Sequence, residues 1–140
     1  MDASLWTKLH GGSTHFPIAL MIASALFDLA GTVWRRGPHS RDLHAAGFWA
    51  LLLGALACLA AVLSGLLMTN WEAVGQGTLA RHHLFVWPAF ALMVGLAVWR
   101  VVVGDRASCH AFGVYLIVSL AAAGLMATAG YWGGELLLGG

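Results

Sequence analysis

Residues 45–69 read AAGFWALLLGALACLAAVLSGLLMT, a run of 25 residues without a charged side chain. A helix needs about 20 apolar residues to cross the hydrocarbon core of a membrane, so this run predicts a membrane-spanning helix. Three further segments are similarly apolar and about as long. The predicted spans are residues 16–34, 45–69, 84–103 and 111–132.

The overall composition predicts a membrane protein. Hydrophobic residues make up 60% of the 140 positions and charged residues only 9%, with a mean hydropathy of +0.81. The residues outside the spans are too few for a separate soluble catalytic domain. A net charge of +1 gives no indication of a nucleic-acid partner. We expect an all-α, integral membrane, up-and-down four-helix bundle that forms a single domain, residues 1–140, with the lipid bilayer around it.

The distribution of basic residues predicts how the bundle is oriented. Most of them fall in or beside the first and third loops, whereas the opposite face has only Lys8 and Arg81; the majority set is Arg35, Arg36, Arg41, Arg100 and Arg106. Positive charge favours the cytoplasmic side, so both termini are expected outside, in the periplasm of a bacterial inner-membrane, multi-pass protein. No signal peptide is expected, and the first span should insert directly.

Each predicted span begins at or beside a histidine, namely His15, His44, the pair His82 and His83, and His110. In an up-and-down bundle the starts of spans one and three share one membrane face, and those of spans two and four share the other. A neutral imidazole is a good ligand for haem iron or another metal, and it is costly to leave in lipid. The sequence therefore predicts two bis-histidine metal sites.

The outer site would use His15 and His83, and the inner site would use His44 and His110. His82 and His83 are separated by about 100° around their helix, so only one of them can face His15. His83 is preferred and His82 remains open. His10 and His39 fall in predicted loops and receive no role. Both halves of the chain contain a helix that opens with histidine, a basic loop and a second such helix, as in an internal duplication, but the residues between do not match.

Two other features lie near the predicted inner site. Glycine recurs along the second and fourth spans, which leaves room for a flat macrocycle or simply allows close helix packing. Asp28 is the only acid inside a predicted span, and it lies about 20 Å along the helix from His15, near the depth of His44 and His110. It is expected to accept a hydrogen bond from a ligating histidine, to carry protons, or to act only in helix packing.

Several motifs resemble a known family. They are His15-Phe16-Pro17-Ile18-Ala19-Leu20, Leu26-Phe27-Asp28-Leu29, the histidine His83, and Gly130-Tyr131-Trp132-Gly133-Gly134-Glu135-Leu136. Over residues 10–138 the chain resembles the bacterial membrane proteins grouped as domain of unknown function 2231. The resemblance implies a redox-associated module, because some members are joined to Rieske or cytochrome c domains. It also adds Glu135 to the cofactor-binding candidates, as a hydrogen-bond partner for a ligating imidazole or a quinol, or as a helix cap.

The resulting functional hypothesis is a membrane cytochrome of b type, an electron-transfer subunit of a larger membrane complex rather than an enzyme by itself. It would hold one or two haem b groups, with quinone as a further ligand, because two imidazoles close both axial positions of an iron and suit electron passage. The expected redox partner is a periplasmic c-type cytochrome, Rieske protein or dehydrogenase subunit. Two alternatives remain, a cofactor-free anchor or assembly subunit and a small metal or proton transporter.

Overall fold

The computed structural model describes residues 3–138, and every long element in it is an α-helix. The helices are α1 (Ala3–Val33), α2 (Ser40–Met68), α3 (Gly77–Val102) and α4 (Cys109–Leu138), with a short 3-10 turn, η1 (Gly104–Arg106), before α4. All four long helices have the length and hydropathy to cross a membrane. The predicted all-α, four-helix membrane fold is confirmed.

The helices extend beyond the predicted spans, most of all at the start of α1. This helix begins at Ala3 instead of Phe16, so His10 lies on a helix and not in a loop, and His15 lies well inside α1. Pro17, which a helix starting at residue 16 would have in its first turn, is a buried interior residue of α1. Apolar composition predicts where a chain enters the hydrocarbon, but a helix can continue past that boundary because its backbone hydrogen bonds remain satisfied.

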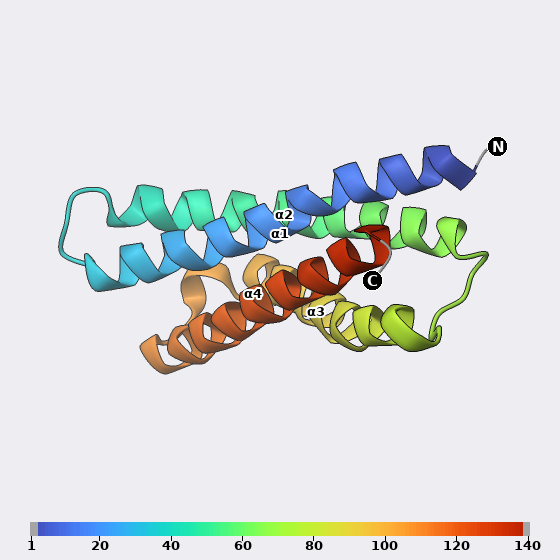
Figure 1. The fold of residues 1–140 in the computed structure, drawn as a ribbon. Helices are drawn as coiled ribbons and strands as arrows, with labels where there is room; N and C mark the ends of the chain where they lie inside the picture. Colours follow the sequence, from blue (N-terminus) through green and yellow to red (C-terminus); the bar gives the residue numbers. More distant parts are fainter. Residues whose placement is uncertain (1–2, 139–140) are drawn as a thin grey trace.

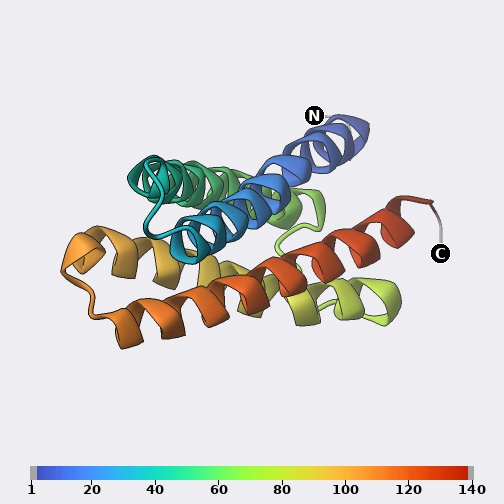
Figure 2. The ribbon, with the colours of Figure 1, turned by 90° about the vertical axis from the view of Figure 1, so that its left-hand side faces the viewer.

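The four helices form two antiparallel hairpins. The helix α1 packs mainly on α2, and α3 packs mainly on α4, with further contacts between α1 and α4. In Figure 1 the start of α1, the α2–α3 connection and the end of α4 lie toward the same end of the bundle. Figure 2 shows the α1–α2 hairpin lying across the α3–α4 hairpin. The connectivity is therefore up and down.

The centre of the bundle is built from small and flexible side chains. Met21, Leu51 and Met93 are fully inaccessible. A methyl group added at Gly54 of α2 would lie 3.1 Å from the Leu20 side chain of α1 and closer still to that of Met93. Many large apolar side chains face outward instead, as expected of helices that contact lipid. The bundle is thus closely packed at its centre. Buried polar groups lie toward one end of it, and a cavity lies toward the other.

Candidate functional site

One end of the bundle contains a buried carboxylate that all four helices share. Asp28 of α1 is completely inaccessible. Its oxygens accept hydrogen bonds from His44 Nδ1 of α2 at 2.8 Å, Arg100 Nη2 of α3 at 3.0 Å and the Tyr115 hydroxyl of α4 at 3.0 Å. We call these four residues the polar cluster. Each of the other three helices donates to the same side chain, so the cluster ties the two hairpins together.

Charge compensation explains why the polar cluster can be buried. Arg100 is only 6% exposed, and its Nη2 also donates to the backbone carbonyl of His44 at 3.1 Å. Its guanidinium lies over the aromatic rings of Phe112 and Tyr115, at 5.0 and 5.1 Å from their centroids. A buried charge is stable only when it is paired and hydrogen-bonded, and Nη2 meets both conditions, whereas the buried Nη1 has no hydrogen-bond partner among the described residues. The Asp28–Arg100 ion pair therefore has a structural role.

The inner pair predicted from the sequence is arranged differently. The His44 ring donates to Asp28 and meets Phe112 edge-on at 5.1 Å, whereas His110 is exposed in the first turn of α4. The contacts of the described residues bring His44 to Asp28 and not to His110. The expected hydrogen bond between Asp28 and a histidine of similar depth is present. Glycine makes room for these side chains, because a methyl group at Gly31 would lie 2.9 Å from the His44 ring.

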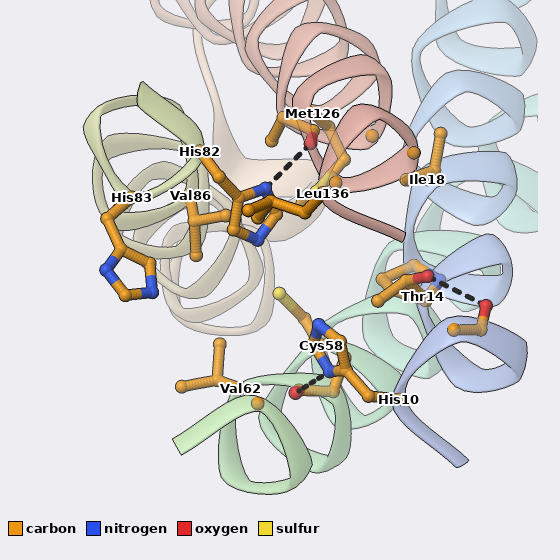
Figure 3. A pocket seen from close by; sticks show the side chains of 18 of the residues that line it. His10, Thr14, Ile18, Cys58, Val62, His82, His83, Val86, Met126 and Leu136 are labelled. Atoms are coloured by element: carbon orange, nitrogen blue, oxygen red, sulfur yellow. Dashed lines mark hydrogen bonds between the residues drawn. The ribbon is translucent and has the colours of Figure 1, made fainter. Parts of the chain in front are cut away.

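The other end of the bundle contains a cavity of about 580 Å³ lined by all four helices. Its walls are mainly apolar, with contributions from Ile18, Val62 and Val86 (Figure 3). Four histidines line it: His10, His15, His82 and His83. We call this space the histidine cavity. An apolar cavity of this size with a few converging polar groups is typical of small-molecule and cofactor sites.

Two of these imidazoles come from opposite hairpins and face each other. Figure 3 shows His10 of α1 and His82 of α3 directed toward one another across the cavity. His10 Nδ1 lies 3.0 Å from the carbonyl oxygen of Ala61, and His82 Nδ1 lies 2.9 Å from that of Ala129. A carbonyl only accepts, so each Nδ1 carries the proton, and in the neutral ring Nε2 is left as an electron-pair donor. Metal-ligating histidines are commonly held in this way.

The predicted outer ligands, His15 and His83, also line the cavity but are not part of the facing pair. His15 is an exposed residue at its wall. The His83 ring donates from Nδ1 to the carbonyl of Val74 at 3.1 Å and lies to the side of the facing pair. Glu135 is partly buried on α4, between the cavity-lining residues Gly134 and Leu136. Of the two adjacent histidines, His82 is the one whose ring faces α1.

Two residues of these sites were not predicted from the sequence: His10 as a residue of the histidine cavity, and Arg100 as the buried ion-pair partner of Asp28. His10, Thr14 and Pro17 share one helical face by their spacing of four and then three residues, and all three line the cavity. That pattern is detectable once the helix is extended toward the N-terminus. Arg100 was used only to orient the bundle, although it lies inside the predicted span 84–103. A lone acid in another span is the signal that such an arginine has a buried partner.

Together these features define a class of protein, an integral membrane four-helix bundle with a buried ion pair at one end and a histidine-lined cavity at the other. A family model described as "Predicted membrane protein (DUF2231)" matches residues 7–139, so the chain belongs to that family. No curated protein and no solved structure matches the chain.

Removing one partner of the ion pair should destabilise the bundle strongly. Asp28→Asn leaves the Arg100 charge buried without compensation, and loss of one partner of a buried pair costs about 3–5 kcal/mol. We expect a markedly lower midpoint of thermal unfolding in detergent. The double variant Asp28→Asn, Arg100→Gln removes both charges and should recover much of that loss. If the double variant is no more stable than Asp28→Asn alone, the pair does not act as described.

Proposed function

We propose that the protein is an electron-transfer subunit that resembles a b-type cytochrome and holds one haem b in the histidine cavity, with His10 and His82 as its axial ligands. The observation that carries this proposal is the facing arrangement of the two imidazoles. The Nδ1 of each ring is hydrogen-bonded to a backbone carbonyl, and the Nε2 of each ring is directed into the cavity. This assignment moves the ligands from the predicted His15 and His83 to neighbouring histidines on the same two helices.

The chemistry of the cavity fits a haem. A haem would need only two ligands from the protein, and His10 and His82 would hold it. The apolar walls suit the faces of a macrocycle, and the volume of about 580 Å³ lies within the usual range of cofactor pockets. When bound, such a group would exchange single electrons. The protein would fix the two imidazoles and keep water away from the iron.

A single haem is proposed because the polar cluster occupies the other end. His44 donates from Nδ1 to Asp28, its Nε2 side lies against Gly31, and His110 is exposed instead of facing it. Asp28 is hydrogen-bonded to three side chains at once. The guanidinium beside Asp28 also argues against a proton relay through this carboxylate, since protonation would leave Arg100 unpaired. The second haem, on His44 and His110, and the transporter hypothesis are therefore not carried further.

The proposed setting is the bacterial inner membrane, with the arginine-rich α1–α2 loop in the cytoplasm and both termini in the periplasm. The histidine cavity then lies near the periplasmic face, because the start of α1 and the end of α4 line it. Electrons would pass between membrane quinone and a periplasmic partner such as a c-type cytochrome, a Rieske protein or a dehydrogenase subunit. We propose that the chain works within such a larger complex.

A reduced-minus-oxidised absorption spectrum of the purified protein tests the haem directly. We expect a sharp b-type signal that is lost in His10→Ala and in His82→Ala, because each variant removes one axial ligand. His39→Ala is the matched control, since His39 is an exposed residue just before α2 and should leave the spectrum unchanged. His15→Ala and His83→Ala should retain most of the signal.

Three outcomes would contradict parts of this proposal. A colourless, well-folded preparation from haem-replete cells would favour the cofactor-free anchor or assembly subunit. Loss of the signal in His15→Ala and His83→Ala, with His10→Ala and His82→Ala unaffected, would return the ligands to the positions first predicted. A signal that survives all four single substitutions would place the haem elsewhere.

The orientation can be tested with the two native cysteines. Cys109 is exposed at the start of α4, on the predicted cytoplasmic side, whereas Cys58 is buried. A membrane-impermeant maleimide should label Cys109 only after spheroplasts are permeabilised. In a cysteine-free background, Glu72→Cys in the α2–α3 connection should be labelled in intact spheroplasts. The opposite pattern would invert the proposed topology.

A further inference from the structure

We infer that Gly65 and Gly133 are positioning residues that orient the two imidazoles of the histidine cavity, and that each hairpin contributes one equivalent half of the site. The effect of these glycines on the orientation of His10 and His82 does not require haem, whereas their effect on haem binding rests on the proposed function. We thereby assign a role to two glycines that neither helix packing nor the family match explains.

The same arrangement occurs once in each hairpin. His10 of α1 donates to the carbonyl of Ala61 on α2, and Gly65 lies four residues further along α2. His82 of α3 donates to the carbonyl of Ala129 on α4, and Gly133 lies four residues further along α4. We call each carbonyl with its following glycine a histidine seat. The first helix of each hairpin thus provides the imidazole, and the second helix provides the seat.

Helix geometry explains why the seat requires glycine. The carbonyl of residue i in an α-helix points toward residue i+4, where it accepts that residue's backbone N–H. A side chain at i+4 would cover the carbonyl from outside. Without one, an imidazole can lie against the backbone and donate to the oxygen. At Ala61 the Ser64 hydroxyl also donates to this oxygen, at 2.9 Å, and lies 3.1 Å from His10 Nδ1.

The distances show how tightly the rings fit. A methyl group at Gly65 would lie 2.9 Å from Cε1 and 3.3 Å from Nδ1 of His10. A methyl group at Gly133 would lie 3.1 Å from Cε1 and 3.4 Å from Nδ1 of His82. The first contact is too short for any carbon pair, so the His10 ring would have to move. The second is tight but needs a smaller displacement.

His10 and His82 differ from the other histidines because each has a histidine seat. His83 is bonded to the carbonyl of Val74, which lies in the α2–α3 connection and not on a facing helix. His44 lies against Gly31 but directs its Nδ1 to Asp28. In the described chain, residues 3–138, a helix carbonyl acceptor followed one turn later by a glycine that lies against the ring occurs at His10 and at His82. The seats therefore select His10 and His82 from the histidines available.

The test compares Gly65→Ala and Gly133→Ala with Gly95→Ala and Gly124→Ala, two helical positions where an added methyl group meets nothing within 4 Å. We expect Gly65→Ala to lower haem affinity by about tenfold or more, as the loss of a partner that orients a metal ligand does. Gly133→Ala should have a smaller effect in the same direction. The two control variants should bind haem as the unaltered protein does.

A second readout does not depend on haem. In ¹⁵N spectra of the apoprotein, the imidazoles of His10 and His82 should be protonated at Nδ1 only, and Gly65→Ala should convert His10 to a mixture of tautomers. If the unaltered protein binds no haem but the tautomers respond as expected, the proposed function fails and the seats stand. If haem binds normally and neither readout changes in Gly65→Ala, the seat at Gly65 is wrong.

A double-mutant cycle covers the case in which Gly65→Ala folds poorly. The added methyl group conflicts with the His10 ring, so the loss of thermal stability caused by Gly65→Ala should largely disappear in a His10→Ala background. Equal losses with and without the His10 ring would show that Gly65 serves helix packing alone, and they would overturn the inference.

Discussion

The hydrogen-bonded ion pair between Asp28 and Arg100 is the constraint on which the arrangement of the helices depends. It joins α1 of one hairpin to α3 of the other, and His44 and Tyr115 bring the remaining two helices to the same carboxylate. For apolar helices in lipid, hydrophobic burial favours no particular axial register between neighbouring helices. Directional hydrogen bonds among four side chains favour one register, and this register sets the depth at which His10 and His82 face each other.

Both ends of the bundle follow one physical rule. Within lipid every polar group needs a partner from the protein itself, because water is not available to supply one. At one end the rule is satisfied by opposite charges and a shared carboxylate. At the other end it is satisfied by backbone carbonyls, which use one nitrogen of each imidazole and leave the second nitrogen as an electron-pair donor in the cavity. The same requirement thus produces a closed cluster in one place and two oriented imidazoles in the other.

The sequence was sufficient to predict the four helices and the family, and it left a hydrogen bond from a histidine to Asp28 as one of three possible roles for that carboxylate. It was not sufficient to predict His10, because hydropathy places the start of the first span at Phe16, whereas the helix begins at Ala3. The glycines of α2 were interpreted as space for a macrocycle or as a sign of close helix packing, yet Gly47 lies against Asp28 and Gly65 against His10. Which side chain fills the gap beside a glycine depends on helix register, and register comes from contacts between hairpins that no local pattern encodes.

The repeated seat also bears on the order of biogenesis. Each seat lies entirely within one hairpin, so the α1–α2 unit can orient its imidazole before α3 and α4 have left the ribosome. The α3–α4 unit brings a second, already oriented imidazole, and the Asp28–Arg100 contact forms only when the two units meet. A chain assembled in this way has both imidazoles oriented in advance and encloses the histidine cavity in the last step of folding. Closure of the cavity and completion of the bundle then become a single event.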